Sequence, residues 1–124
     1  MKFDFASQIP IYQQVADQIE AGILQGSFVE CTQIPSTTEI SRAFKINPAT
    51  VLKGMNVLVS QGIIEKRRGV GMFVLAGSKE KVHQKRKQQF LETEVKELII
   101  EAKKLAITKA DLLSLLEEEF IDGK

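Results

Sequence analysis

Two helix-start signals in close succession, at Ser36 and at Asn47, constrain the fold of this chain more than any other feature. Ser36 is followed three residues later by Glu39, which is the spacing of a capping box, in which each side chain satisfies a backbone N–H of the other residue. Asn47 precedes Pro48, and proline suits the first helical position because it has no N–H to leave unsatisfied. Two short helices joined by so tight a turn predict a helix-turn-helix.

The second of these helices has two faces of different character. Val51, Met55 and Leu58 recur at helical spacing and are expected to face the core, and Gly62 is expected to end the helix. The residues that then point away from the core are Ala49, Lys53, Asn56 and Ser60, with Thr50 and Leu52 on the flanks. A small residue, a lysine and an asparagine suit base edges and phosphates in a major groove. The same pattern also fits an ordinary solvated helix face.

After Gly62 the hydrophobic period changes from that of a helix to that of strands. Residues 63–68 and 72–75 flank the sequence Gly69-Val70-Gly71, which predicts a β-hairpin. A glycine tip is thin enough to enter a minor groove, and the basic residues beside it could contact phosphates: Lys66, Arg67 and Arg68. The glycine pair alone is equally typical of a plain hairpin turn. The order helix, turn, helix, basic hairpin predicts a winged helix-turn-helix.

A further amphipathic helix is expected upstream, from Pro10 to about Gly26, because apolar residues recur there at helical spacing. The connection that follows is expected to hold a very short strand around Gln33 and Ile34.

Beyond Gly77 the sequence is helical again, so we place the domain boundary there: residues 1–77 and residues 78–124. Thr108 and Asp111 form a second capping box, which divides this part into two helices. The predicted fold class is mainly α with a small β-hairpin wing, followed by a C-terminal two-helix dimerisation segment.

The two C-terminal helices carry more apolar surface than they can bury against each other. A second copy of the chain would supply the missing partner; the alternative is that the helices fold back on the winged domain of a monomer. The predicted dimer contacts are Leu91, Val95, Leu98, Ile99, Ala102, Leu105, Leu112, Leu113, Leu116 and Phe120. A cavity between chains could bind a small effector, or this region could be dimer core alone.

Positive charge is concentrated locally, although the formal net charge of the whole chain is only +1. Between residues 42 and 68 a single acidic residue, Glu65, stands among six basic ones: Arg42, Lys45, Lys53, Lys66, Arg67 and Arg68. A second basic cluster covers residues 79–87. It could be a solvated helix start, or it could reach phosphates beside the wing.

The composition excludes several classes of protein. Of the 124 residues, 44% are hydrophobic and 27% are charged, which is ordinary for a globular domain. There is no run of apolar residues long enough to span a membrane, and the first residues lack the pattern of a secretory signal. The single cysteine, Cys31, fits a reducing cytoplasm and is expected to be either a small buried residue or a surface thiol.

Catalytic equipment is scarce. The single histidine, His83, lies in the lysine-rich stretch KEKVHQKRK, where a general base is hard to orient. One histidine and one cysteine far apart in the sequence do not make a metal-ligand set. We therefore expect no enzyme activity, no metal and no cofactor.

Three stretches resemble the N-terminal domain of the GntR family of bacterial transcription regulators. They are IPIYQQVADQIEAGILQGSF, IPSTTEIS and INPATVLKGMNVLVSQGIIEKRRGVGMFV, and the match runs from Ile9 to Val74. The resemblance implies a winged helix that binds DNA as a dimer on a pseudo-palindromic operator. Only 47 residues follow residue 77, which resembles the short YtrA-like branch. That branch implies repression, dimerisation through the C-terminal helices and control of a transporter operon.

The resemblance also implies which residues contact DNA. The contacts at the start of the second helix fall on Asn47, Ala49 and Thr50, and the wing contacts fall on Arg68, Gly69 and Gly71. Two arginines common in the family are replaced here by Thr38 and Leu52. Lys45 and Lys53 are candidates to compensate for them. The full predicted set of DNA-binding residues is Ser36, Thr38, Lys45, Asn47, Ala49, Thr50, Lys53, Asn56, Arg67, Arg68, Gly69 and Gly71.

The expected function is therefore that of a cytoplasmic, homodimeric, sequence-specific regulator of transcription, most simply a repressor, whose partners are double-stranded DNA and a second copy of the chain. The rival interpretation is a winged helix used for protein–protein interaction without sequence-specific DNA binding. The response to salt separates the two, because phosphate contacts release counterions and weaken steeply as salt rises.

Overall fold

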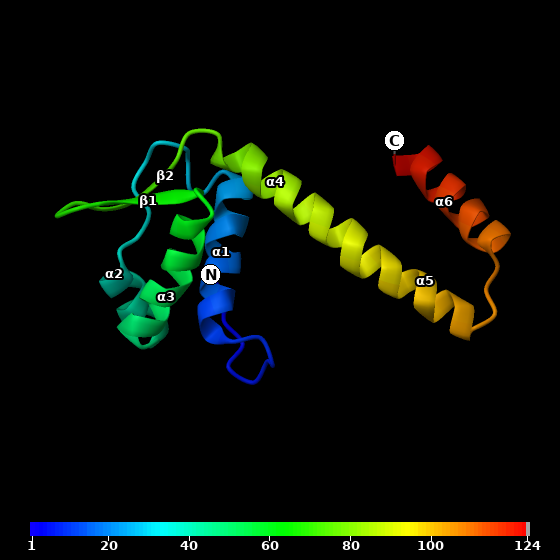
Figure 1. The fold of residues 1–124 in the computed structure, drawn as a ribbon, viewed down its shortest axis with the longest axis horizontal. Coiled ribbons are helices and arrows are strands. Elements are labelled where there is room, and N and C mark those ends of the chain that lie inside the picture. Colours follow the sequence, from blue (N-terminus) through cyan, green and yellow to red (C-terminus); the bar gives the residue numbers. More distant parts are fainter. Residues whose placement is uncertain (124) are drawn as a thin grey trace. The chain divides into compact units, whose positions relative to one another are not determined.

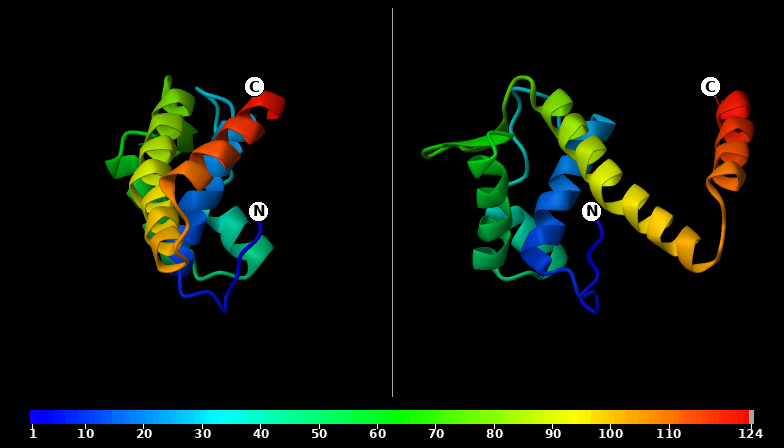
Figure 2. Two further views of the ribbon diagram at one scale, coloured as in Figure 1. Left: turned by 90° about the vertical axis from the view of Figure 1, so that its right-hand side faces the viewer. Right: turned by 45° about the vertical axis from the view of Figure 1, so that its right-hand side comes forward.

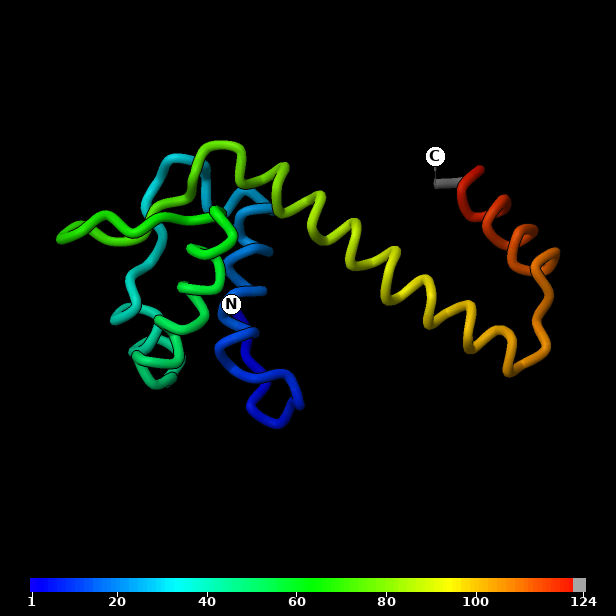
Figure 3. The backbone as a smooth tube through the Cα atoms, viewed as in Figure 1, coloured from blue at the N-terminus to red at the C-terminus, as the bar shows by residue number. Residues whose placement is uncertain are grey.

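The computed structural model describes residues 1–123 and the side chains of residues 1–121. The described chain forms two compact units, Met1–Lys85 and the residues from Arg86 onward, which are described separately below. Figures 1, 2 and 3 show the course of the chain. Its elements are α1 (Ile11–Gln25), α2 (Thr37–Phe44), α3 (Pro48–Ser60), β1 (Ile64–Arg67), β2 (Gly71–Val74), α4 (Ser78–Gln89), the π-helical segment η1 (Phe90–Glu94), α5 (Val95–Lys104) and α6 (Lys109–Gly123).

The core of the first unit lies where α1 packs on α3. Val51, Met55 and Leu58 are fully buried in it, as the periodicity of α3 predicts. The two helices approach closely at Gly54, where a Cβ atom would lie 2.5 Å from the carbonyl oxygen of Tyr12. A larger residue would have to push the helices apart, so this glycine sets their separation.

The helix-turn-helix forms as its two start signals predict. The Ser36 hydroxyl accepts a hydrogen bond from the Glu39 N–H, and the Glu39 carboxylate accepts one from the Ser36 N–H. In the turn Lys45 is left-handed, with φ of 56°, which costs a non-glycine residue about 1 kcal/mol. Ser41 compensates by closing the turn, since its hydroxyl donates to the carbonyl of Ile46 at 2.6 Å.

The hairpin forms a small antiparallel sheet, with Ile64 opposite Val74 and Arg67 opposite Gly71. The connection before α2 runs along the other edge of β2. There Gln33 pairs with Phe73, and the Ile34 N–H donates to the Met72 carbonyl at 3.0 Å. The short strand expected at Gln33 and Ile34 is thus a single bridge that braces the wing.

The first two turns of α4 belong to the first unit. Val82 is fully buried in its core, and the buried Ser78 hydroxyl donates to the Ile63 carbonyl at 2.5 Å. The Lys85 ammonium pairs with the carboxylate of Glu20, which is only 2% exposed. The compact units therefore meet at Lys85 and not at the boundary expected after residue 77.

The start of α4 is capped by a side chain from a distant part of the sequence. The Lys79 N–H donates to the carboxylate of Glu30 at 3.0 Å. This hydrogen bond, together with the one from Gly77, holds the pKa of Glu30 below its ordinary value, because both favour the charged form.

The second unit is a helical hairpin with almost no core of its own. The predicted capping box opens α6, because the Asp111 N–H donates to the Thr108 hydroxyl and the Thr108 N–H donates to the Asp111 carboxylate, each at 3.1 Å. The pKa of Asp111 is lowered by these hydrogen bonds. Among the described hydrophobic residues of this unit, Ala102 alone is buried.

Candidate nucleic-acid interface

The predicted DNA-binding residues gather at three places in the first unit: the start of α2, the start and outer face of α3, and the hairpin. Figure 1 shows the hairpin projecting from the side of the unit on which α2 lies. Most of the predicted side chains are exposed, whereas Ser36, Thr50 and Gly71 are partly buried. These elements form the scaffold on which the interface would be built.

The beginnings of α2 and α3 each present free helical N–H groups next to a short polar residue. At α2 the Ser36 side chain is occupied by the capping box, and Thr38 lies exposed on the first turn. At α3 the Asn47 side chain accepts a hydrogen bond from the Ala49 N–H at 2.8 Å. The remaining N–H groups and the positive end of each helix dipole favour phosphate. Asn47 thus contributes by starting the helix, which its amide oxygen is already doing.

On the outer face of α3, Lys53 has an aromatic neighbour that the sequence did not suggest. Its ammonium lies 4.1 Å from the centre of the Tyr12 ring on α1. A cation over a ring face gains about 0.5–1 kcal/mol at an exposed site. Lys53 is therefore held beside α1, while Ala49 and Asn56 are exposed on the same helix.

Within the hairpin, the two arginines differ in their surroundings. The Arg67 guanidinium lies 4.0 Å from the centre of the Phe73 ring, and its Nε lies 3.7 Å from the Glu65 carboxylate. Arg68 follows at the exposed tip, beside Gly69 and Val70. Gly69 has φ of 77° and space around it, so the tip is thin, as its sequence predicts.

The turn of the helix-turn-helix presents Lys45 to solvent. Its left-handed backbone holds the lysine between the end of α2 and the start of α3, and the side chain is exposed. A lysine in this place can reach a phosphate next to a groove that α3 enters.

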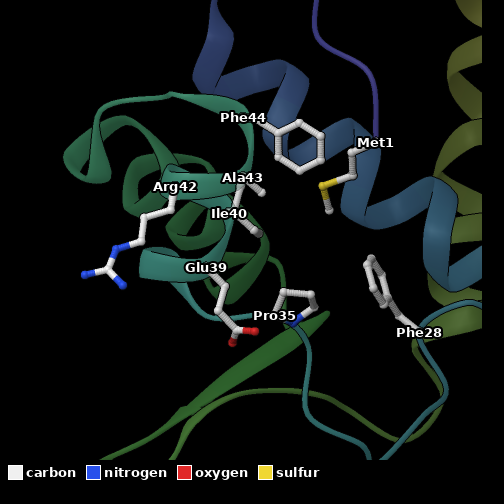
Figure 4. A pocket seen from close by; sticks show the side chains of 8 residues that line it. All are labelled: Met1, Phe28, Pro35, Glu39, Ile40, Arg42, Ala43 and Phe44. Atoms are coloured by element: carbon white, nitrogen blue, oxygen red, sulfur yellow. The ribbon is translucent and has the colours of Figure 1, made fainter.

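A shallow apolar pocket of about 610 Å³ lies beside α2, away from the starts of α2 and α3. Figure 4 shows Met1, Phe28 and Phe44 around the hollow and the Arg42 guanidinium directed away from it. The other charged residue of its lining, Glu39, serves the capping box. The pocket therefore lacks a convergent set of polar groups of the kind that catalysis needs.

The structure adds two further observations on chemistry. Cys31 is an exposed thiol, which decides between its two sequence-based interpretations. In the part of the chain that the structure describes, no cluster of histidine, cysteine or carboxylate side chains could hold a metal ion. None of the described helices has both the length and the hydrophobicity needed to cross a membrane.

The predicted dimer residues lie in the second unit, and most of them are exposed in the single chain. Leu98 is 54% exposed, Leu116 is 52% exposed and Phe120 is 68% exposed. Val95 and Leu112 are partly buried. A groove of about 530 Å³ runs between α5 and the beginning of α6, with an apolar floor and glutamates along its rim.

Sequence reasoning missed the residues that hold the basic side chains in place. Tyr12, Phe73 and Glu65 are all brought to their partners by the fold, and Tyr12 is far from Lys53 in the sequence. Glu65 was noted only as the one acid of the basic segment. The regular alternation of the hairpin places Glu65 opposite Phe73 and could have suggested that grouping.

Comparison with known proteins identifies the family. The pattern that defines the "Bacterial regulatory proteins, gntR family" matches residues 11–74. The HTH-type transcriptional repressor YtrA of Bacillus subtilis is 29% identical over 124 residues, which cover all of this chain and 95% of YtrA.

Two solved structures extend the comparison. A putative transcriptional regulator of the GntR family from Bacteroides thetaiotaomicron superposes with a TM-score of 0.79 at 34% identity, over 92% of this chain and all of that one. The DNA-binding domain of AraR in complex with operator ORX1 superposes with a TM-score of 0.54 at 32% identity, over 60% of this chain and 92% of that one. The chain belongs to the GntR family of bacterial regulatory proteins, resembles YtrA, and is a DNA-binding transcriptional regulator.

Proposed function

We propose that the chain is a homodimeric, sequence-specific repressor that binds a two-fold symmetric operator in the bacterial cytoplasm. In each protomer α3 enters a major groove and the wing reaches the adjacent minor groove. Two such half-sites would be separated by about one helical turn, roughly 34–36 Å. The observation that carries this proposal is the exposed set of helix starts and basic hairpin on one winged helix-turn-helix.

Each predicted DNA contact has a proposed role. Ala49, Thr50 and Asn56 read base edges, and Lys53 does so from its position beside Tyr12. The N–H groups at the starts of α2 and α3, near Ser36, Thr38 and Asn47, fix the register on phosphates. Lys45, Arg68 and the thin tip formed by Gly69 and Gly71 extend the contacts to both sides of the groove. Arg67 shapes the wing through its contacts with Phe73 and Glu65.

Dimerisation is supported by the lack of core in the second unit. A helical hairpin with one buried hydrophobic residue, Ala102, cannot offset the entropy of ordering its chain. Pairing with the same hairpin of a second copy would bury the exposed apolar side chains, at about 25 cal/mol per Å² of apolar surface. The symmetry of such a pair matches that of a palindromic operator.

Repression and control of a neighbouring transporter operon are proposed from the likeness to YtrA, which is named as a repressor. An effector is not required by this proposal. Its identity would depend on a cavity formed between protomers.

Selection of binding sites from random duplex DNA with the purified protein, followed by footprinting of the selected sequence, tests the proposal. We expect a two-fold symmetric consensus with two protected half-sites. The slope of log affinity against log salt should be close to the number of phosphates contacted by the dimer. Binding without enrichment would contradict sequence specificity, and failure to bind at low salt would favour the protein–protein interaction module.

A further inference from the structure

The tip of the wing is held by a residue outside the hairpin. Gln33 lies in the connection before α2, and its side-chain amide donates to the carbonyl of Val70 at 2.8 Å. Val70 is 59% exposed and stands between the two glycines of the tip. Inside the hairpin the Val70 N–H donates to the Arg67 carbonyl at 2.9 Å. The tip residue is thus fastened through both of its backbone polar groups.

The backbone around Gln33 aims this side chain at the tip. Gln33 pairs with Phe73 of β2, so the two side chains lie on the same face of the sheet. Gly71 is two residues before Phe73 and therefore lies on that face as well. A Cβ atom at Gly71 would stand 2.5 Å from the Gln33 side-chain nitrogen. The missing side chain at Gly71 is the space through which Gln33 reaches Val70.

The opposite edge of β2 has a matching brace. Arg67 pairs with Gly71 across the hairpin and places its guanidinium over Phe73. One face of β2 is therefore covered by Arg67 from β1 and by Gln33 from the connection. A two-stranded hairpin is marginally stable on its own, so these two contacts decide how firmly the tip is oriented.

We infer that Gln33 is a positioning residue for DNA binding: it fixes the orientation of the wing tip and thereby presents Val70 and Arg68 to the minor groove. The inference rests on the proposed function for its DNA contacts, whereas the bracing itself concerns the free protein. It assigns Gln33 no contact with DNA. An oriented tip loses less conformational freedom on binding than a loose one.

Two substitutions separate the hydrogen bond from the space that the side chain fills. Gln33→Met keeps the length of the side chain but removes the donor. Gln33→Glu keeps its shape and places an acceptor against the Val70 carbonyl. Gln25→Met, at an exposed glutamine that ends α1, is the matched control.

The first measurement is the ¹⁵N heteronuclear NOE of Gly69, Val70 and Gly71 in the free, full-length protein. We expect it to fall at these three amides in both Gln33 variants and to stay at the wild-type value in Gln25→Met, with thermal unfolding unchanged in all. Wild-type values at the tip in both Gln33 variants would overturn the inference.

The second measurement is footprinting on the selected operator in both grooves. We expect the Gln33 variants to lose hydroxyl-radical protection of the flanking minor groove and to keep guanine N7 protection in the major groove. Affinity should fall roughly two- to tenfold, as expected for one lost hydrogen bond. A uniform loss of protection in both grooves would overturn the positioning role. A loosened tip in a protein whose wild type binds no DNA would support the bracing and contradict the proposed function.

Discussion

At the scale of single residues, the surroundings of a basic side chain determine how much it can contribute to DNA binding. Arg67 and Arg68 are adjacent in the sequence, but the first lies on Phe73 and near Glu65, whereas the second is exposed at the tip. A guanidinium that leaves such partners to reach a phosphate gives up part of what it gains. Contacts of this kind make neighbouring arginines unequal.

We predict that Arg68→Gln lowers operator affinity and reduces the slope of log affinity against log salt by about one, as for one lost phosphate contact. Arg67→Gln should leave the slope close to that of the wild type. Fluorescence anisotropy with labelled operator at several salt concentrations measures both slopes. Equal losses of slope in the two variants would show that Arg67 leaves Phe73 when DNA binds.

Lys53 poses a different question, because it lies on the outer face of α3 but is held over Tyr12. If it reads a base, Lys53→Ala should relax the preference at one operator position by about 1–3 kcal/mol. Uniform weakening on all sequences would identify a phosphate contact. Tyr12→Leu is the companion variant, since it keeps the lysine and removes the aromatic face that restrains it. Site selection with each variant gives the position-specific preferences.

At the scale of secondary-structure elements, the first unit includes more of α4 than the sequence suggests. Gly77 looks like a hinge, but Ser78, Val82 and Lys85 all contact the first unit through the fold. The sequence of α4 hides this because Val82 is the one apolar residue in its first turns. A single buried valine has no periodicity to reveal it.

We therefore predict that a fragment of residues 1–89 unfolds cooperatively, whereas a fragment of residues 1–77 is much less stable. Burying Val82 alone is worth roughly 1.5–3 kcal/mol, which is a large part of the stability of a small domain. Urea unfolding followed by circular dichroism compares the two fragments. Equal midpoints would place the boundary at residue 77 after all.

The cap of α4 predicts a dependence of stability on pH. The backbone N–H of Lys79, and then that of Gly77, lower the pKa of Glu30 from its ordinary value of 4.5. A carboxylate with a lowered pKa in the folded state contributes stability that is fully present above 4.5 and is lost as pH falls through the folded pKa.

Glu30→Gln should accordingly be less stable than the wild type at pH 7, and the difference should shrink as the pH falls below 4.5. Urea unfolding midpoints of both proteins across this range provide the measurement. Glu118→Gln, at an exposed position of α6, is the control for the loss of one negative charge. A difference that stays constant with pH would mean that the carboxylate charge does not strengthen the cap.

The elements themselves were predictable where local rules act. Ser36, Asn47 and Thr108 begin their helices as their side chains predict, because a cap is decided within four residues. The π-helical segment at Phe90–Glu94 was not predicted, since no residue type marks it. There the Val95 N–H bonds to the Phe90 carbonyl, so Phe90 replaces Leu91 as the neighbour of Val95 along the expected seam. Contacts such as Lys53 on Tyr12 depend on tertiary packing, which a one-dimensional pattern does not contain.

At the scale of the whole molecule, the two units have opposite degrees of self-sufficiency. The first has a closed core, whereas large apolar side chains of the second are exposed along both α5 and α6: Leu98, Ile99, Ile100, Leu105, Leu113, Leu115, Leu116, Phe120 and Ile121. Exposed apolar surface of this extent marks an interaction site in a soluble protein. DNA binding and dimerisation are therefore expected to be linked, because the second unit supplies affinity only by joining two first units.

The dimer prediction uses one charge introduced on each unit. Leu98→Glu places a carboxylate on the exposed apolar face of α5, and we expect it to yield a monomer by sedimentation equilibrium. Val29→Glu makes the same kind of change at a position of the first unit that is 58% exposed, and it should leave the dimer intact.

Joining two half-site binders raises affinity by a factor of 10² or more when both engage at once. The Leu98→Glu variant should therefore lose at least about that factor on the full operator and almost nothing on an isolated half-site. A monomer that still binds the full operator with wild-type affinity would refute the link between the units, because each half-site would then be bound independently. A variant that remains dimeric would move the interface from this face of α5 to the apolar residues of α6, where Leu116→Glu gives the corresponding test.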